Sequence, residues 1–291
     1  MKFFLLILFF PFLANAQQAN RFWENPAAFS TELNRAWIET QGNCSSENSV
    51  PVTIVKSRSS TLSLKDRGLT LSEMLKFIQT TPFFPQVNSL DLRNTELSAD
   101  DLIQFNKLVS RMTTVTDFYF GGSSIGDKRV LMNFILINLA SKIEILDLSN
   151  IKLSAEDCVM LASSLHNMKN LRILYLGNNN IGDEGFNRLM NGAFTNLPNL
   201  QILSLTANNL TDASLKRFAM FSMPLMKNLQ ILDLKSNNFG KNTVALLMRN
   251  SFYLPQLAVL DLGDGNGISR DSPSALVRCS TISSQSFVDP K

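Results

Sequence analysis

The sequence predicts an α/β solenoid, a horseshoe in which short strands form an inner parallel sheet and helices form an outer row. Three observations predict this fold class. A pattern of the form L-x-L-x-x-N-x-L recurs about eight times at intervals of 28–29 residues. The first part of each repeat alternates as a strand does, and the second part has the spacing of a helix. Self-similarity at such a period is the signature of stacked units that share one core.

The first segment, residues 1–16, predicts a secretory signal peptide. A cationic start is followed by an apolar run over residues 3–13, and Ala14 and Ala16 are small residues at the −3 and −1 positions of a cleavage site. A membrane-spanning helix needs about 20 apolar residues, so this run is too short. We therefore expect export, cleavage after Ala16, and a periplasmic or secreted mature chain without a membrane span.

The two ends of the mature chain depart from the repeat. Residues 17–59 predict an N-terminal cap, because segment 26–40 has the apolar spacing of a helix and a solenoid needs a cover over its open core. A separate function for Trp23 and Trp37 is the alternative. Residues 269–291 predict a C-terminal cap, with a short helix near 273–279, and then a tail.

Residues 60–268 contain the repeats, and their starts are evenly spaced. Successive starts lie 28, 28, 28, 28, 29, 29 and 28 residues apart. The pattern begins at Leu62, Leu90, Phe118, Leu146, Leu174, Leu203, Leu232 and Leu260. No second domain is needed to account for this part of the chain.

Each repeat begins with a strand and a turn. Leu174 and Leu176 alternate with Ile173 and Tyr175, which predicts one buried and one outward face. An asparagine after the strand can hydrogen-bond the backbone of the turn, and it stands at Asn179, Asn208 and Asn237. We expect a less regular asparagine ladder in the N-terminal half, where the equivalent positions hold Arg67, Thr95, Ser123 and Ile151, and a shifted position at Asn266.

The second half of each repeat predicts a helix. Ile181, Gly185 and Leu189 follow one another at four-residue spacing and would share a helical face. Residues that favour helix starts stand at Thr70 (with Glu73), Ser98, Ser154 and Thr211. Strands stack about 4.8 Å apart and helices need roughly 10 Å. The stack must therefore curve, with the strands on its concave side.

This pattern resembles the ribonuclease-inhibitor-like class of leucine-rich-repeat proteins over about residues 60 to 270. The resemblance implies a protein-binding module and does not imply catalysis or a cofactor. Together with the predicted signal peptide, the layout is similar to that of exported bacterial leucine-rich-repeat proteins, including those that pathogens send toward host cells. The step from fold to function is an analogy.

Residues with potential chemistry are few and scattered. No metalloprotease, Walker, C-x-x-C or nucleophile-elbow motif is present. We expect His166 to be a surface or structural residue and Cys158 to be a small core residue. Cys44 and Cys279 would lie at opposite ends of the array, roughly 30 Å apart, which is beyond disulfide reach. We therefore expect no catalytic residues, no cofactor and no metal. Asn43 and Asn209 begin N-x-S/T sites, which matter only where exported proteins are glycosylated.

Charge also limits the partners. Lys and Arg number 27 and Asp and Glu 24, for a net charge of +3, and no basic stripe is visible. Nucleic acid is therefore a poor candidate partner. We expect a monomer that binds a protein.

The predicted binding surface is the concave strand face. One row of outward positions is aliphatic, and we interpret it either as a ladder that stabilises the sheet or as an apolar strip for a partner: Ile145, Ile173, Ile202, Ile231 and Val259. The second row is polar or aromatic, and we interpret it either as a solvated face or as a recognition surface: Asp91, Tyr119, Asp147, Tyr175, Ser204, Asp233 and Asp261. Arg93 and Lys235 stand two positions farther along, and we expect Lys235 to offset the neighbouring charges of Asp233 and Asp261.

Three functions follow from this interpretation. The first is a secreted protein-binding module that uses the concave face, with host proteins as the candidate partners. The second is a periplasmic or envelope protein with a structural or interaction role. The third is an enzyme or a glycan binder, and the concave face has few aromatic residues for stacking on sugars. The three are separated by partner capture, by fractionation, and by turnover or glycan-array assays.

Overall fold

The computed structural model describes residues 60–63, 87–109, 114–135, 139–191, 193–263, 266 and 276–278. The predicted signal peptide, the N-terminal cap, Cys44 and Cys279 lie outside these ranges. The described residues cover most of the predicted repeats.

One sheet runs the length of the described fold. Its strands are ordered β1-β2-β4-β6-β7-β8-β9-β10-β11, so that chain order and spatial order agree. Every neighbouring pair is parallel except β10 and β11. The strands are β1 (Ser60–Ser63), β2 (Val87–Asp91), β4 (Asp117–Tyr119), β6 (Ile145–Asp147), β7 (Ile173–Tyr175), β8 (Ile202–Ser204), β9 (Ile231–Asp233), β10 (Val259–Asp261) and β11 (Leu276–Arg278).

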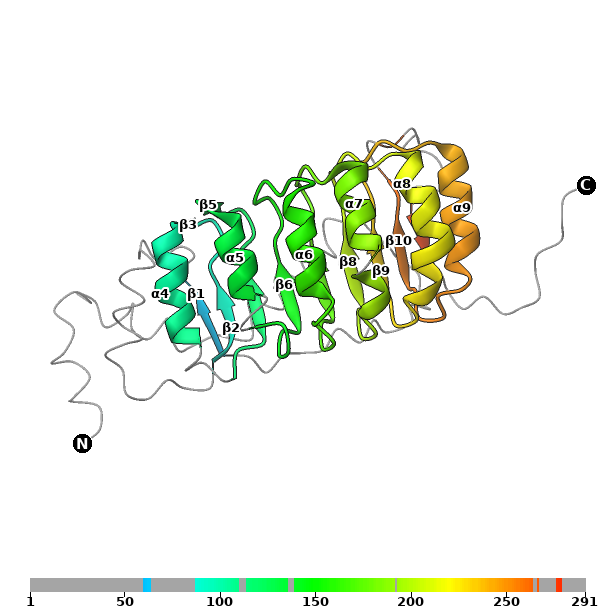
Figure 1. The fold of residues 1–291 in the computed structure, drawn as a ribbon. Helices are drawn as coiled ribbons and strands as arrows, with labels where there is room; N and C mark the ends of the chain where they lie inside the picture. Colours follow the sequence, from blue (N-terminus) through cyan, green and yellow to red (C-terminus); the bar gives the residue numbers. More distant parts are fainter. Residues whose placement is uncertain are drawn as a thin grey trace, which may run out of the picture.

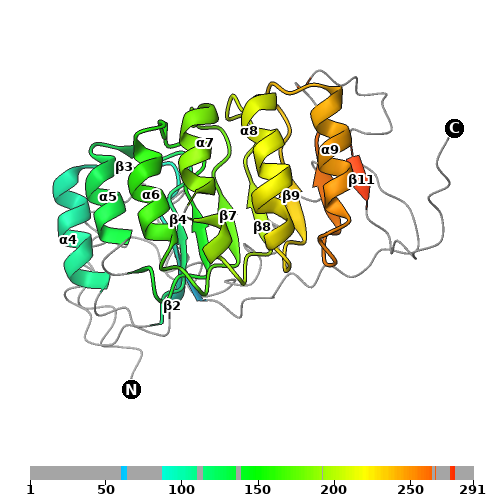
Figure 2. The same cartoon turned by 45° about the vertical axis from the view of Figure 1, so that its right-hand side comes forward.

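A row of helices covers one face of this sheet. Figures 1 and 2 show the helices standing side by side in one layer, with the strands in a second layer behind them. The α-helices are α4 (Ala99–Val109), α5 (Lys128–Phe134), α6 (Asp157–Leu165), α7 (Gly182–Met190), α8 (Asp212–Arg217) and α9 (Lys241–Ser251). A short 3-10 helix η2 (Phe194–Asn196) follows α7, and a π-helix η3 (Phe218–Ser222) and a 3-10 helix η4 (Met223–Leu225) follow α8. The predicted α/β solenoid, a leucine-rich-repeat fold, is confirmed.

The core lies between the two layers. The first leucine of each strand pairs in register with its neighbour's, as in Leu146 with Leu174 and Leu174 with Leu203. These side chains belong to one continuous buried cluster with the helix residues. Phe186 and Phe218, from successive helical segments, place their ring centroids 5.4 Å apart in a tilted pair. Each repeat therefore buries its apolar surface against the next one.

The asparagine ladder holds the turns after the strands. Asn237 is buried, and its Nδ2 donates to the carbonyls of Leu205 and Leu234 at 3.0 and 2.8 Å. In the N-terminal half hydroxyls take over part of this role: the Oγ atoms of Thr95 and Ser123 each donate to the Leu92 carbonyl at 2.6 Å. The ladder is therefore less regular there, as the sequence indicates.

The helix starts at Ser98, Ser154 and Thr211 have the expected caps. Ser154 and Asp157 form a reciprocal pair, in which the Asp157 carboxylate accepts from the Ser154 N–H at 2.8 Å and Ser154 Oγ accepts from the Asp157 N–H at 3.3 Å. Ser98 and Asp101 make the same pair. Thr211 Oγ1 accepts from Ala213 N at 3.2 Å. Thr70 lies outside the described residues.

Two local features differ from the sequence interpretation. Leu276–Arg278 form the strand β11, antiparallel to β10, so the closing helix predicted near 273–279 is wrong over these residues. The antiparallel strand pairs with the backbone edge that β10 would otherwise leave exposed. A second, two-stranded sheet, β3 (Glu96–Leu97) with β5 (Ser124–Ile125), joins the turns of two N-terminal repeats and was not predicted.

Candidate functional site

The structure brings the predicted concave residues together in two register rows. Tyr119 pairs with Asp147, Asp147 with Tyr175, and Tyr175 with Ser204. The aliphatic row is equally continuous, from Ile145 on β6 to Val259 on β10. Both rows face away from the core, because the alternate strand positions belong to the leucines of the core cluster.

This face is less open than the sequence interpretation supposes. Half of the fourteen predicted contact residues are buried: Asp91, Asp147, Ile202, Ser204, Ile231, Asp233 and Asp261. The other half are partly exposed: Arg93, Tyr119, Ile145, Ile173, Tyr175, Lys235 and Val259. The interpretation of the second row as a freely solvated polar surface is therefore wrong.

The middle of the aliphatic row is buried. Ile202 and Ile231 are only 6% and 2% exposed, although neither belongs to the core cluster. Each of the two has an aliphatic neighbour on both adjacent strands, whereas Ile145 lies beside Asp117. Lateral packing of β-branched side chains stabilises a sheet. This geometry supports the ladder interpretation at Ile202 and Ile231. Ile173 also lies between two isoleucines, Ile145 and Ile202, but it stays partly exposed, as Ile145 does.

The acids of the second row are engaged with the backbone, which the sequence interpretation missed. In each case the carboxylate accepts the N–H of the residue two positions later. The Oδ1···N distances are 3.1 Å for Asp91 and Arg93, 2.9 Å for Asp147 and Ser149, 3.2 Å for Asp233 and Lys235, and 3.1 Å for Asp261 and Gly263. The i to i+2 spacing of an aspartate and an N–H at a strand end is the sequence signal that would have identified this role.

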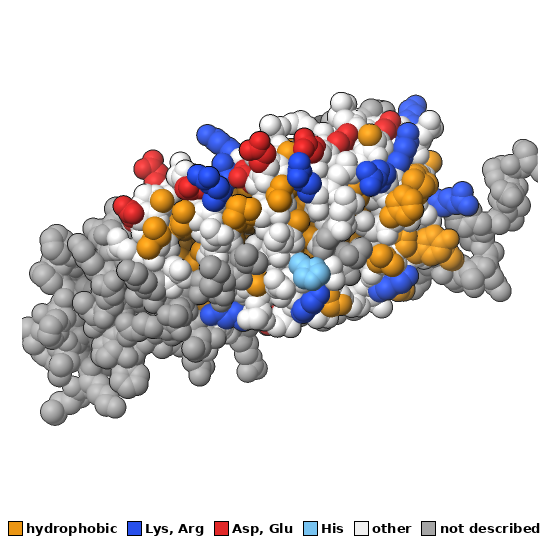
Figure 3. All heavy atoms as spheres, viewed as in Figure 1, with side chains coloured by type: hydrophobic (Ala, Val, Ile, Leu, Met, Phe, Trp, Pro, Cys, Tyr) orange, Lys and Arg blue, Asp and Glu red, His pale blue; other side chains and the backbone are white. Residues whose placement is uncertain are grey.

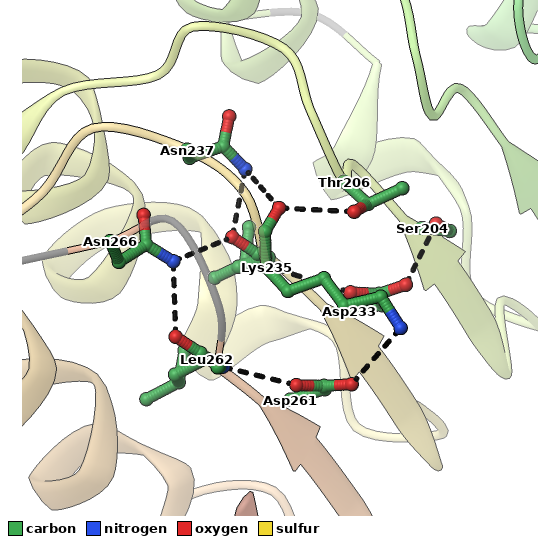
Figure 4. A network of polar contacts seen from close by, with 10 residues as sticks. Ser204, Thr206, Asp233, Lys235, Asn237, Asp261, Leu262 and Asn266 are labelled. Atoms are coloured by element: carbon green, nitrogen blue, oxygen red, sulfur yellow. Dashed lines mark hydrogen bonds and ion pairs between the residues drawn. The ribbon is translucent and has the colours of Figure 1, made fainter. Parts of the chain in front are cut away.

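At the C-terminal end these acids form a polar network (Figure 4). Ser204 Oγ donates to Asp233 at 3.3 Å, and Lys235 Nζ lies 3.5 Å from Asp261 Oδ2 in an ion pair. Lys235 thus offsets the adjacent acids, as predicted, by pairing with the carboxylate on the neighbouring strand. The pKa of Asp233 is raised to about 6, mainly by burial; the charge of Lys235 opposes this shift and the charge of Asp261 adds to it.

At the N-terminal end a cluster of larger side chains keeps some exposure. The Arg93 guanidinium binds Asp91 through two hydrogen bonds of 2.8 and 2.7 Å, and its central carbon lies 5.4 Å from the centre of the Tyr119 ring. Burial raises the pKa of the Tyr119 and Tyr175 phenols, so both are neutral hydrogen-bonding groups. We call Arg93, Tyr119, Ile145, Ile173 and Tyr175 the tyrosine patch.

Cys158 and His166 belong to the same helical segment but differ in exposure. Cys158 is buried in the core, as predicted, and burial raises the pKa of its thiol to about 12. His166 is exposed just after the end of α6. Within the ranges that the structure describes, no group of His, Cys, Asp and Glu side chains has the arrangement of a metal site. Among the same residues, no helix has both the length and the apolar character needed to cross a bilayer.

Comparison with known proteins agrees with the repeat architecture. The family model described as a leucine-rich repeat matches residues 167–186 and 196–219. The chain is 33% identical over 104 residues to the NACHT, LRR and PYD domains-containing protein 3 of Macaca mulatta and of Homo sapiens. Each match covers 35% of this chain and 10% of the relative, so the chain corresponds to about a tenth of those proteins.

Among solved structures, internalin C2 of Listeria monocytogenes is similar, with a TM-score of 0.46 and 24% identity. The similarity covers 74% of this chain and 75% of that one. The strand register, the asparagine ladder and the matched segments together identify this chain as a protein built of leucine-rich repeats.

Proposed function

We propose that this chain is a protein-binding module and that the tyrosine patch on its concave face contacts the partner. The observation that carries the proposal is a contrast within one face. At its C-terminal end Ser204, Asp233 and Asp261 are buried and held by hydrogen bonds or an ion pair, and only Lys235 and Val259 are partly exposed, whereas five large side chains at the other end keep part of their surface in solvent. Extended sheet surfaces of stacked repeats are used in this way.

The patch has the composition of a binding hot spot. Tyrosine and arginine are enriched among residues that dominate binding energy. Tyr119 and Tyr175 lie on either side of Asp147 in one register row, so the rings are two strand spacings apart, about 10 Å. Because the Arg93 charge is already neutralised by Asp91, we expect recognition by apolar packing and phenol hydrogen bonds more than by charge.

We also propose that the protein acts after export, as a secreted ribonuclease-inhibitor-like repeat protein directed at host proteins. The signal-like pattern of residues 1–16 supports export. Mass spectrometry of the purified chain tests it, because export predicts a mature N-terminus at Gln17. Fractionation separates release into the medium from the alternative, which is an envelope protein retained in the periplasm.

Affinity capture tests the binding surface. The wild-type chain, a Tyr119→Ala/Tyr175→Ala variant and an Ile103→Ala/Val159→Ala control are used as baits in host-cell and envelope lysates. The control removes two exposed apolar side chains of α4 and α6, away from the sheet. We expect one protein to be retained by the wild type and the control and lost by the tyrosine variant, with all three baits folded by circular dichroism. Loss on the control alone would place the site on the helices instead.

A further inference from the structure

A cluster of exposed apolar side chains lies on the helical side of the last two complete repeats, away from the tyrosine patch. Phe221 and Phe252 are 67% and 59% exposed, which is unusual for phenylalanine. Four further large apolar side chains are exposed in the same two segments: Met220, Leu225, Met248 and Tyr253. In Figure 3 this surface is the orange area at the right-hand end, where α8 and α9 lie in Figure 1.

The side chains of this cluster come from neighbouring elements. Helix α9 packs against both η3 and η4, the segments that carry Phe221 and Leu225. Lys227 Nζ donates to the Tyr253 carbonyl at 3.1 Å, which ties the loop after η4 to the end of α9. Phe252 and Tyr253 meet edge to face with ring centroids 6.5 Å apart. The cluster is therefore one continuous surface.

The charge around this cluster is mostly positive, and the acid nearest to it, Asp212 in the first turn of α8, interacts with Lys216. Between residues 213 and 260 the chain has one acid, Asp233, which is buried on the sheet. Five cations lie exposed on the helical side of the same segment: Lys216, Arg217, Lys227, Lys241 and Arg249. Among the described residues, none of the five makes an ion pair with a carboxylate. The first turns of α4 and α7 each carry two acids, whereas the first turn of α9 carries none.

We infer that this surface, the basic aromatic patch, docks the protein on an anionic lipid bilayer. Exposed phenylalanine, leucine and methionine can enter the boundary between headgroups and acyl chains, and the surrounding lysine and arginine bind anionic headgroups. The proposal is independent of the concave face, so the tyrosine patch remains free to bind a protein at the same time.

Vesicle co-sedimentation with the full chain tests the proposal, using vesicles of phosphatidylcholine alone or with an equal amount of phosphatidylserine. Each cation near an anionic surface strengthens binding about fivefold, so we expect at least tenfold tighter binding to the phosphatidylserine vesicles and loss of this preference at high salt. Any binding by residues 1–16 is common to all variants and cancels in the comparison between them.

Two variants and one control make the test specific. Phe221→Ser/Phe252→Ser and Lys216→Gln/Arg249→Gln should each weaken binding to phosphatidylserine vesicles at least tenfold. Ile103→Ser/Val159→Ser, which alters exposed apolar side chains on α4 and α6, outside the patch, should leave it unchanged. Equal binding to both vesicle types, or equal loss in the control, overturns the proposal. A wild-type dimer in sedimentation velocity that Phe221→Ser/Phe252→Ser separates would also overturn it, because the patch would then join two copies of the chain.

Discussion

Two equivalent residues of the asparagine ladder differ in the hydrogen bonds that their side-chain oxygens accept, and this difference allows a prediction about stability. Asn179 and Asn208 occupy the same position in successive repeats, and both are buried. The Oδ1 atom of Asn179 accepts the N–H groups of Ile151 and Leu153 at 3.1 and 2.9 Å, and its Nδ2 donates to the Leu148 carbonyl at 2.9 Å. Among the described residues, no donor reaches Oδ1 of Asn208.

The consequences of alanine at the two sites therefore differ. Asn179→Ala removes the side-chain acceptor of two buried N–H groups, and a buried group without a partner costs about 1–3 kcal/mol. The three carbonyls that Asn208 contacts keep other donors, from Asn179, Asn237 and the N–H of Asn178. We expect Asn179→Ala to lower the free energy of unfolding by about 3–5 kcal/mol and Asn208→Ala by about 1–2 kcal/mol. Both substitutions remove the same side-chain volume, so the destabilisation caused by the cavities left behind is similar and largely cancels in the comparison.

Urea denaturation followed by circular dichroism measures the difference. Because solenoids can unfold in steps, hydrogen exchange at the Ile151 and Leu153 amides provides a second readout. These two amides should lose protection in Asn179→Ala and keep it in Asn208→Ala. Equal losses of stability, or a larger loss in Asn208→Ala, would show that the two hydrogen bonds accepted by Asn179 Oδ1 are not the main contribution, and would refute the reasoning.

Four other predictions concern single residues. In the native state Asp233 keeps its proton up to about pH 6, whereas an unfolded aspartate has a pKa of about 3.9. Stability therefore falls as the pH rises through this window. Urea denaturation should show that Asp233→Asn raises the free energy of unfolding by up to about 3 kcal/mol at pH 7 and leaves it unchanged at pH 4. Ala207 has a φ of 51°, so Ala207→Asn, which tolerates the left-handed region, should raise the free energy of unfolding by about 0.5–1 kcal/mol. A Cβ on Gly185 would lie 2.9 Å from Ala155 Cα and 3.1 Å from Cys158 Sγ, so Gly185→Ala should lower the melting temperature although alanine favours helices more than glycine does. The Cys158 thiol should resist a thiol reagent in the native protein and react after denaturation, which a colorimetric titration can follow.

The sequence predicts the fold well because the fold depends on local periodicity. The leucine positions place every repeat strand in its observed register, and the asparagines at 179, 208 and 237 lie in the turns as expected. The strand β11 was missed because its pairing with β10 is a tertiary contact that no repeat pattern encodes. The small β3–β5 sheet was missed for the same reason.

The candidate site was predicted less well. The strand alternation places the residues of the two rows in register, but it says nothing about how deeply a side chain is covered. Asp233 and Ile231 point away from the core and are still buried, because neighbours on the same face enclose them. The basic aromatic patch was missed because most of its apolar members, Met220, Phe221, Leu225, Phe252 and Tyr253, come from the irregular segments after α8 and α9, where the periodic pattern ends.

The most direct test of the central proposal is site-specific photo-cross-linking on the concave face. A photoreactive phenylalanine analogue replaces Tyr175 in one chain and the exposed Ser163 of α6 in a control chain, and both are irradiated in the lysate that yields the captured partner. Protein binding through the tyrosine patch predicts a single cross-linked partner from position 175 and none from position 163. A cross-link from position 163 alone, with none from position 175, would contradict the account and place the binding surface on the helices.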